Sequence, residues 1–470
     1  MEININKKID NRQFIIMGEP YKSEDFSSVS LSEKIVLSYH SGLKIHKLNE
    51  CLLLGDAFSV LPQLPLCDIG IESMPYIAGR WVLIHKNKLY LDACGSLGVY
   101  YTQHHGQLLL SSSLHLLSEM TGKKWHADYK AESGKGGILD YYPIPYTPYE
   151  GIKKLLPSQT ISFDGEVSFR SNYMIPRYKN KNIHALITDF IDAMSCEMQN
   201  ISKEYGNNVW FSLTGGYDSR VNVAIAKYSG IQFHVYTALR DSLKMFDLLR
   251  AKQVCRKIGV KHETIDDRSI VADSKQREEA FDIHTGGHIT FGTEKKQFIA
   301  ASDVINAEES IVLWGTMWAM SYKAYENFMA PCKGKTEIYR EISKWASEPM
   351  NCSWVHKKSI GEWIDYTLYN PISNMDWRQR LYWEERNGAW VSAAHQGIDL
   401  FDSIRIAPVN CQYLIEILLS FPDNLQHDKI KQKMIIDQCC PKLRKVPYGE
   451  SIAIITLHRI RNKASQIFKR

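Results

Sequence analysis

One eight-residue stretch carries the residue types of an anion-binding turn. It reads Leu213-Thr214-Gly215-Gly216-Tyr217-Asp218-Ser219-Arg220. A short apolar segment precedes it and a helical pattern follows, and paired glycines let the backbone approach a ligand closely. The N–H groups and the positive dipole end of the following helix would face a bound anion. The sequence therefore predicts a phosphate site between a strand and a helix.

The side chains of the turn extend this prediction. Thr214 and Ser219 add hydroxyl donors, and Arg220 could complement further negative charge. A carboxylate at Asp218 would repel phosphate, so we expect it to hold Mg²⁺ that bridges to phosphate oxygens. The alternative is an ordinary Gly-Gly turn with a helix-start aspartate, but the combination of strand, hydroxyl, Gly-Gly and Asp-Ser favours a nucleotide site. The turn is not a Walker A loop, since no Gly-Lys-Ser/Thr follows.

The residues around the turn predict a parallel sheet. Apolar residues from Ile183 to Ile201 recur at three- and four-residue steps, which indicates an amphipathic helix with Asn182 as its cap. The following elements are a strand over 209–213, a helix over 220–229, a strand over 231–237 and a helix over 247–258. A strand, turn, helix and strand in this order form a βαβ unit. The remainder of the chain reads mainly as helices.

The first 170 or so residues are instead typical of a β-rich layered domain. Strands are expected over 77–85, 89–91, 99–102 and 107–112, a short helix over 113–120 and a strand and turn over 160–165. We place a domain boundary near residue 175. The expected architecture is thus α/β, with a β-rich domain over 1–175 and a parallel-sheet domain over 176–470.

Composition excludes several classes of protein. The 470 residues are 44% hydrophobic and 23% charged, which indicates two or three folded domains. A net charge of +5 does not by itself predict a nucleic-acid partner. The sequence shows no secretion signal and no uninterrupted apolar stretch of about 18 residues, so no membrane span is expected. Ten cysteines without CxxC spacing fit free thiols in a reducing cytoplasm.

These motifs together resemble the asparagine synthetase superfamily. Its synthetase domain carries an SGGxDS turn that binds the pyrophosphate of ATP, and residues 214–219 match it with Thr for the first Ser. Asp247 and the helix and strand that follow it are also similar to the family, and Tyr236 would lie beside adenine. Upstream, residues 79–101 and 151–157 resemble the class II glutamine amidotransferase domain. The resemblance implies an Ntn-like first domain and an ATP-pyrophosphatase (adenine nucleotide alpha hydrolase-like) second domain with a helical C-terminal part.

The chain departs from that family at three places. Glutaminases of this class use an N-terminal cysteine, whereas position 2 is Glu2 and the first cysteine is Cys51, so we expect no glutamine hydrolysis by that mechanism. A later loop is acidic and glycine-rich in the family. Its counterpart at 311–319 keeps a glycine but has no acid, which leaves a second Mg²⁺ contact without a residue to make it. The element over 381–390 resembles less-studied synthetase-like proteins rather than true asparagine synthetases.

The resemblance implies an ATP-dependent, AMP-forming amide ligase. Such an enzyme adenylates a substrate carboxylate and transfers the acyl group to an amine, forming a C–N bond. The cofactors would be ATP and Mg²⁺. The partners would be a small-molecule, peptide or sugar carboxylate and an amine, with no nucleic acid, and a homodimer is the assembly considered. The alternatives are a thiolating enzyme of the same nucleotide fold and a degenerate synthetase that serves as a scaffold.

The resemblance also suggests residues for the second half of the reaction. Tyr382 and Glu384 are candidates for the base, since a Tyr–Glu pair serves this role in the β-lactam synthetases; the alternative for Glu384 is a structural ion pair with Arg386. A late lysine would steady the adenylate and pyrophosphate. The three candidates are Lys429, Lys431 and Lys433. Lys431 is the first choice, against the alternative of a solvated helix lysine.

Two further segments carry competing interpretations. The run from His284 to His288 invites a metal site, but it lacks other ligands at zinc spacing, so a loop bordering the substrate pocket is preferred. The basic tail over 459–470 could touch an anionic surface, and a solvated terminal helix is the preferred reading.

Overall fold

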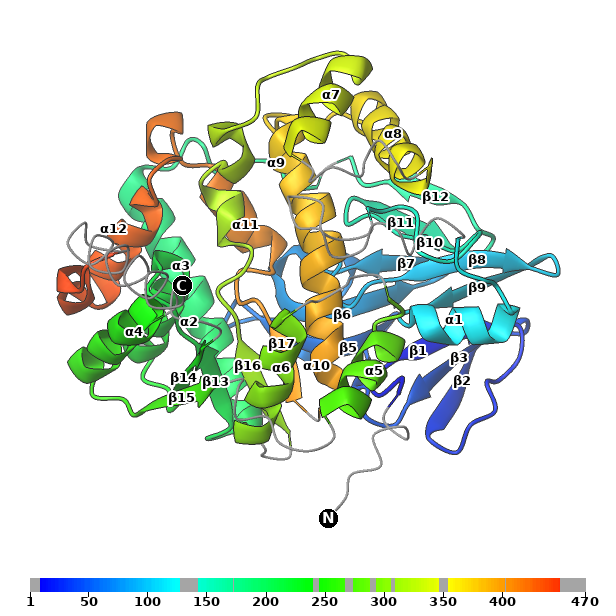
Figure 1. Cartoon of the computed structure of the whole chain (residues 1–470), viewed down its shortest axis with the longest axis horizontal. Coiled ribbons are helices and arrows are strands. Elements are labelled where there is room, and N and C mark those ends of the chain that lie inside the picture. The colour runs from blue at the N-terminus through cyan, green and yellow to red at the C-terminus, as the bar shows by residue number, and fades with distance from the viewer. Residues whose placement is uncertain are drawn as a thin grey trace, which may run out of the picture.

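The computed structural model is an α/β protein with antiparallel and parallel sheets, as predicted (Figure 1). It describes residues 9–126, 143–171, 173–239, 245–266, 274–287, 293–305, 309–345, 354–401 and 403–448. The basic tail and His288 lie outside these ranges. No helix in the described ranges has both the length and the apolar character needed to cross a bilayer.

The N-terminal part consists of two six-stranded antiparallel sheets that pack face to face. The first has the order β10 (Lys153–Lys154), β8 (Tyr100–His104), β9 (Gln107–Ser111), β1 (Phe14–Met17), β3 (Ile35–His40) and β2 (Phe26–Ser32). The second has the order β12 (Val167–Phe169), β11 (Gln159–Ser162), β7 (Lys88–Leu91), β6 (Ile77–His85), β5 (Cys51–Ser59) and β4 (Ile45–Lys47). Phe14 and Ile16 of the first sheet meet Leu54 and Val82 of the second in one apolar core. The prediction of a layered β-rich domain is confirmed.

The outer faces of both antiparallel sheets are also covered. Helix α1 (Leu114–Thr121) packs its buried leucines on the first sheet, and the short helix η3 (Ile71–Tyr76) covers the second. Because both faces of β6 are buried, its residues are apolar in succession rather than alternating. The sequence analysis located β6, β7, β8, β9, β11 and α1 but not the strands before residue 60.

The C-terminal part is built on a five-stranded parallel sheet, as predicted. Its order is β15 (His262–Asp266), β14 (His234–Leu239), β13 (Val209–Ser212), β16 (Ser310–Leu313) and β17 (Ser403–Ile406). The chain runs from β13 outward to β14 and β15, and then returns to the other side of β13 with β16 and β17. The strand order therefore reverses between β13 and β16, which is where open α/β sheets leave a crevice at the carboxyl ends of their strands.

Three helices follow the predicted pattern closely around β13. They are α2 (Ile183–Tyr205), α3 (Tyr217–Tyr228) and α4 (Met245–Ile258). The Asn182 side chain caps α2 by accepting the Ala185 N–H at 2.8 Å, as expected. Helix α3 begins at Tyr217, three residues earlier than predicted, because Gly216 in extended conformation is already its N-cap. Strand β14 begins at His234, three residues later than predicted.

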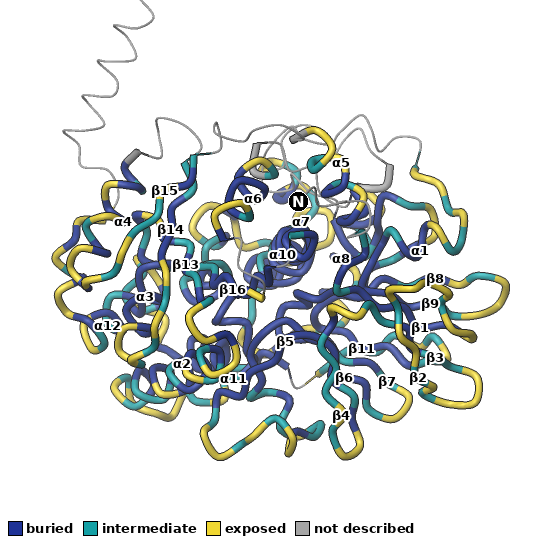
Figure 2. The backbone as a smooth tube through the Cα atoms, turned by 90° about the horizontal axis from the view of Figure 1, so that it is seen from below, coloured by how far each residue is buried: buried dark blue, intermediate teal, exposed yellow. Residues whose placement is uncertain are grey.

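The remaining chain is mainly helical, as expected, but it also supplies β16 and β17. Its helices are α5 (Ser274–His284), α6 (Thr293–Val304), α7 (Lys335–Trp345), α8 (Trp354–Tyr369), α9 (Trp377–Leu381), the π-helix η10 (Tyr382–Val391), α10 (Ser392–Asp399), α11 (Gln412–Leu419) and α12 (Ile430–Cys439). α9, η10 and α10 form one continuous rod across the molecule (Figure 1). Figure 2 shows α10 buried between the parallel sheet and the antiparallel strands.

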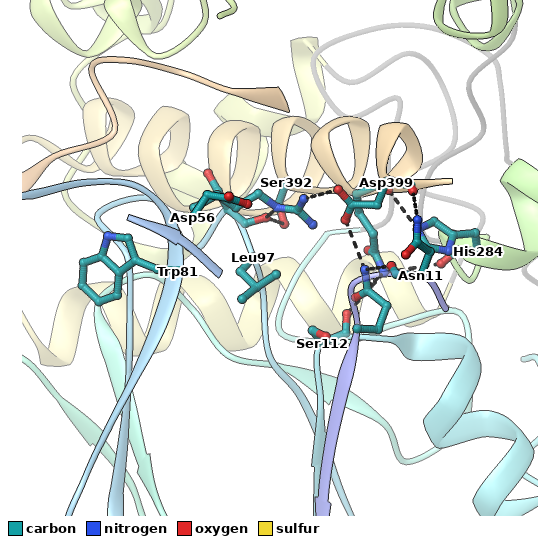
Figure 3. A network of polar contacts seen from close by, with 12 residues as sticks. Asn11, Asp56, Trp81, Leu97, Ser112, His284, Ser392 and Asp399 are labelled. Carbon is teal, nitrogen blue, oxygen red and sulfur yellow. Dashed lines mark hydrogen bonds and ion pairs between the residues drawn. The ribbon is translucent and has the colours of Figure 1, made fainter. Parts of the chain in front are cut away.

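A buried polar joint fixes this rod to the antiparallel sheets (Figure 3). The Asp399 carboxylate accepts the Arg80 guanidinium at 2.7 Å and the Gln13 amide at 3.2 Å. His284 accepts the Asp10 N–H at 3.1 Å through Nδ1, and its Nε2 lies 2.9 Å from the Gln396 carbonyl oxygen. His284 is therefore a structural bridge at the end of α5 rather than a pocket-lining or metal-ligating residue. No cluster of three candidate metal ligands occurs in the described ranges.

The predicted domain boundary near residue 175 falls between the end of β12 and the start of α2. The parts of the chain before and after this boundary are joined at Asp399. Helix α10 belongs to the later part, yet the Asp399 carboxylate at its end is buried against Gln13, next to β1, and Arg80 of β6. The division at 175 stays a prediction.

Candidate functional site

The glycine turn, residues 213–220, lies at the carboxyl end of β13 and leads into the start of α3. The Thr214 N–H donates to Ser219 Oγ at 3.0 Å, and the two hydroxyl oxygens lie 3.1 Å apart. The Gly216 N–H lies 3.3 Å from Thr214 Oγ1. Gly216 is the N-cap of α3 and supplies no side-chain cap, so the first-turn N–H groups of the helix have no capping side chain. The turn is thus shaped in advance and has the form of the predicted anion site.

Two neighbours hold the turn in place from the side of β14. The Leu213 N–H donates to the Tyr236 carbonyl oxygen at 2.9 Å, and Thr237 Oγ1 donates to the Leu213 carbonyl oxygen at 2.7 Å. From α4, Asp247 accepts the Gly215 N–H at 2.8 Å. A Cβ at Gly215 would stand 2.9 Å from that Asp247 oxygen, so glycine is required for this contact. The aspartate that resembles the family's helix motif therefore orders the turn.

Asp218 points to the mouth of the turn, toward α12 and the loop after β16. Its Oδ2 accepts the Tyr322 hydroxyl and the Lys429 ammonium, each at 3.2 Å, and its Oδ1 accepts the Gln432 amide at 3.2 Å. Burial raises the pKa of Asp218, while Lys429 and the hydrogen bonds oppose that rise. The side chain keeps 21% of its surface exposed, so it is open to a ligand.

The residues around Asp218 fit a metal ion that arrives with its phosphates. Magnesium is commonly held by one or two carboxylates, waters and substrate phosphates rather than by a protein cage. Asp218 is such a carboxylate, and the described ranges hold no group of three acidic or histidine ligands beside it. The loop after β16 adds no acid, as the sequence analysis expected.

The loop after β16 lies directly against the glycine turn. Gly315 follows β16, and a Cβ built on it would stand 2.8 Å from the Ser219 nitrogen and 3.2 Å from the Asp218 carbonyl carbon. Glycine is thus needed where β16 and α3 approach each other most closely. Tyr322, further along the loop, contributes a hydroxyl to Asp218 in place of an acid.

The prediction that Arg220 complements ligand charge is wrong. Its guanidinium is fully buried and donates to the carbonyl oxygens of Val446 at 2.7 Å, Gly215 at 3.0 Å and Pro447 at 3.1 Å. Arg220 is the fourth residue of α3, so its side chain leaves the helix toward the C-terminal segment and not toward the turn's opening. Its role is to anchor that segment to the turn.

The prediction of Lys431 as the late lysine is also wrong. Its ammonium is buried and donates to the Leu418 carbonyl oxygen at 2.9 Å. Lys429, one of the two alternatives, is the lysine at Asp218. Lys433 lies 5.6 Å above the Tyr217 ring, so it also faces the start of α3. The site is therefore flanked by two lysines of one segment, and Lys431 points away from them.

We predict that Lys431 makes stability depend on pH. Burial lowers its pKa from 10.5 to about 7. A buried lysine that is neutral in the fold and charged when unfolded gives a free energy of unfolding that rises with pH between those two values. Lys431→Met removes this contribution, so chemical denaturation at about pH 6, 7.5 and 9 should show a shallower rise than the wild type. Equal slopes in both proteins would contradict the assignment.

Tyr382 and Glu384 occupy different surroundings although they are only two positions apart. Tyr382 lies in η10 with its ring 5.1 Å from Tyr325, and the charge of Asp218 adds to the burial that raises the pKa of Tyr382. It therefore borders the Asp218 side of the site. Glu384 is fully buried and contacts Ser158, Trp363 at 2.8 Å and Arg380 at 2.9 Å.

These contacts correct the Glu384 prediction. None of its partners belongs to the phosphate turn or to the cavity beside it. The ion-pair alternative is favoured, with Arg380 as the partner instead of Arg386. Arg386 lies instead 4.1 Å above the Trp390 ring. Helical spacing explains the difference, because Arg380 and Glu384 are four positions apart and lie on one face, whereas residues two apart, such as Glu384 and Arg386, do not face each other.

A cavity of about 280 Å³ adjoins the turn at the reversal of strand order. Its near wall comes from β13 and β14 and includes Leu213, Thr214 and Tyr236, the residue predicted to lie beside adenine. Its far wall comes from α6, the end of β16, η10 and β17. The lining residues there are Gln297, Phe298, Ala301, Trp314, Arg386, Trp390 and Arg405.

The sequence analysis did not identify the far wall. Arg405 is the residue from which the far wall could have been predicted. It stands between Ile404 and Ile406 in an apolar strand, and an arginine that is buried in such a strand indicates a partner or a ligand. Trp314, Trp390 and Gln297 carry no such signal, since they come from three separate elements. Tyr322 and Gln432 were likewise missed as partners of Asp218.

Comparisons with known proteins give distant structural neighbours. No family model and no curated protein matches the chain. An NMN synthetase from Francisella tularensis is 13% identical, with 43% of this chain and 93% of that chain covered and a TM-score of 0.21. An NH3-dependent NAD synthetase from Campylobacter jejuni is 14% identical, with 45% and 96% covered and a TM-score of 0.23. A U34-tRNA thiolase from Methanococcus maripaludis is 10% identical, with 59% and 87% covered and a TM-score of 0.21.

At TM-scores this low, the likeness gives no argument about function, so the function is inferred from the geometry of the site. That geometry is an uncapped helix start behind a glycine turn, a carboxylate and lysines at its mouth, and an adjoining cavity with aromatic and cationic walls. These features lie together where the strand order of the parallel sheet reverses, between β13 and β16.

Proposed function

We propose that this protein is an ATP-dependent, AMP-forming ligase that activates a substrate carboxylate and transfers the acyl group to an amine. The observation that carries the proposal is the glycine turn with the uncapped start of α3, placed beside Asp218 and Lys429. Backbone N–H groups and a helix dipole favour a polyphosphate at this position. The adjoining cavity offers room for the reacting acid.

The proposed reaction has two balanced steps. A carboxylate oxygen attacks the α-phosphorus of ATP, a new P–O bond forms, and the bond to the bridging oxygen breaks to release pyrophosphate. An amine nitrogen then attacks the acyl carbon and loses a proton to water, the bond from the acyl carbon to the phosphate oxygen breaks, and AMP leaves with the former carboxylate oxygen. Negative charge builds on the pyrophosphate in the first step, where donors placed in advance lower the barrier.

Residues of this chain would serve both steps. The N–H groups at the start of α3 hold the pyrophosphate, and Lys429 and Lys433 add positive charge beside it. Asp218 would hold Mg²⁺, which supplies charge neutralisation on the phosphate oxygens when bound. Tyr382 faces this region with a pKa raised by burial, so its hydroxyl stays protonated at neutral pH and can orient an amine through its oxygen lone pair.

The amine in this proposal does not come from glutamine hydrolysis in the N-terminal part. A thiol nucleophile must be a thiolate to act. Burial raises the pKa of Cys51 and raises that of Cys94 well above its usual value. The segment just before β1, with Asn11 and Gln13, is engaged in the joint with Asp399. In this proposal the N-terminal sheets support the rod.

A binding titration separates the ligase from the scaffold alternative. Calorimetry with Mg²⁺ and α,β-methylene-ATP should show one site per chain, and adenosine should bind at least about tenfold more weakly because it lacks the phosphates that the turn holds. Equal affinity for adenosine and the ATP analogue would contradict the phosphate role of the turn. Absence of binding by the analogue would favour a scaffold.

A further inference from the structure

The far wall of the cavity is rich in cations and rings and poor in acids. Its polar residues are Gln297, Arg386 and Arg405, and its rings are Phe298, Trp314 and Trp390. The acid that lines this cavity, Asp247, is engaged with the Gly215 N–H on the opposite wall. Among the described residues that line this wall there are two arginines and no carboxylate.

Arg405 is the most unusual residue of this wall. It is 3% exposed, and its guanidinium carbon lies 4.6 Å from the Phe298 ring centroid and 4.7 Å from that of Trp314. Its Nε and Nη1 have no hydrogen-bond partner in the described ranges. Burial lowers the pKa of Arg405, and Tyr236 is the group that opposes this. A buried guanidinium without a counter-ion is costly, and an anionic ligand would remove that cost.

The Arg405 side chain points toward the middle of the sheet, where the strand order reverses. Arg405 belongs to β17, whereas Tyr236, its polar contact, belongs to β14. β16 and β13 lie between these two strands. The Arg405 side chain therefore extends across the sheet toward β14, and it lines the same cavity as Thr214 of the glycine turn. An anion held by Arg405 would share that cavity with a nucleotide on the turn.

The aromatic rings of the far wall indicate which kind of group would carry that anion. The Trp314 and Trp390 ring centroids lie 6.0 Å apart at an interplanar angle of 36°. Behind them, both nitrogens of His395 lack a partner in the described ranges, and burial together with Arg80 and Arg405 lowers the His395 pKa well below its usual value. His395 is thus neutral and adds no charge. Indole faces favour planar, polarisable groups over flexible polar chains.

We infer that the far wall is the acyl-substrate subsite and that it takes a small carboxylic acid with a planar or aromatic body, whose carboxylate pairs with Arg405. The inference rests on the proposed function, because the bound acid is then the one that attacks ATP. Gln297, in the same wall, has an amide nitrogen without a partner among the described residues and supplies a second donor for the carboxylate.

The test uses benzoate as the probe and benzamide as its uncharged counterpart. Binding to the full-length protein is followed by tryptophan fluorescence and by ligand-observed NMR. A fragment of this size should bind in the range of about 1–10 mM. We expect benzamide to bind at least about tenfold more weakly, and Arg405→Met to weaken benzoate at least about tenfold. Trp314→Leu should weaken both probes, since it removes a ring rather than a charge.

Matched controls show that the variants stay folded. Arg277→Met removes another arginine that lies over a ring, 5.2 Å from Phe401, and outside this cavity, so benzoate binding should match the wild type. Arg405→Met should melt at the wild-type temperature or above it, because an apolar side chain replaces an unpaired buried charge. A lower melting temperature together with unchanged benzoate affinity would show a structural arginine and overturn the inference.

The outcomes also separate this inference from the proposed function. Benzoate that binds Arg405→Met as well as the wild type, or that fails to saturate the wild type at about 50 mM, overturns the subsite while leaving nucleotide binding intact. Loss of α,β-methylene-ATP affinity in Arg405→Met, with benzoate affinity unchanged, would make Arg405 a nucleotide ligand and also overturn it. Charge-selective benzoate binding without any ATP-analogue binding would retain the subsite and refute the ligase.

Discussion

Asp218→Asn should reduce AMP formation by at least about 100-fold, the scale seen when a charge-stabilising group is removed from an active site. The substitution keeps the size of the side chain, but it leaves one acceptor oxygen in place of the two that Tyr322 and Gln432 donate to, and it removes the negative charge at the mouth of the turn. The Lys429 ammonium then has no counter-ion, and a metal-bound polyphosphate loses its protein carboxylate. The readout is AMP released from ATP in the presence of a panel of carboxylic acids that includes benzoate.

Asp437→Asn is the matched control for this prediction. Asp437 lies on α12, as Gln432 does, and forms a largely exposed ion pair with Arg444. Exposed pairs contribute little to stability, so this variant should retain activity within about twofold. If Asp218→Asn keeps the wild-type rate, the carboxylate has no part in the reaction. Because burial raises the pKa of Asp218, activity should also fall on acidification at a higher pH than for an ordinary aspartate.

Glu384→Ala should destabilise the fold by about 3–5 kcal/mol, the cost of leaving one charge of a buried pair without its partner. Glu384 and Arg380 are both almost fully buried and lie 2.9 Å apart between α8, β11 and η10. Removing the carboxylate leaves the guanidinium with neutral partners, the Asn370 carbonyl oxygen and the Ser158 hydroxyl, and with the Tyr366 ring 5.0 Å away, but without its counter-ion Glu384. Chemical denaturation followed by circular dichroism measures the loss.

A double variant decides whether Glu384 is structural or catalytic. Arg380→Met with Glu384→Leu removes both charges and should recover most of the lost stability. If Glu384→Ala instead keeps the wild-type free energy of unfolding and loses turnover, Glu384 acts in the reaction, and its assignment to the ion pair is wrong.

Much of the site's backbone could be predicted from sequence because local rules govern it. The Gly-Gly turn, the cap at Asn182 and the strand before the turn depend on residues close together in the chain. Gly216 is extended and is the N-cap of α3, so the helix starts directly after the glycines. The alternating signal of a half-buried strand also sufficed for β7, whereas β1 is buried throughout and gave no such pattern.

Side-chain directions could not be predicted in the same way. Lys429 and Lys431 differ by two positions, yet Lys429 is the left-handed N-cap of α12 with φ of 55°, and Lys431 lies inside the helix and faces the core. Arg220 shows the same limit, because its partners come from residues 443–447, more than 200 positions away.

The far wall illustrates a third limit, which is tertiary assembly. Arg405, Trp314 and Gln297 come from β17, the end of β16 and α6, and they meet only because the parallel sheet reverses its order beside β13. Sequence spacing carries no information on such a meeting. The buried arginine in an apolar strand is the single local sign of it.

Phosphorus-31 NMR of the reaction products tests the central claim most directly. The protein is incubated with ATP, Mg²⁺, a carboxylic acid that binds the cavity and an amine, and the phosphorus signals are followed over time. A carboxylate attacking the α-phosphorus at the glycine turn gives AMP and pyrophosphate in equal amounts, and neither forms with Asp218→Asn. Formation of ADP and inorganic phosphate would place the attack at the γ-phosphorus and contradict the account.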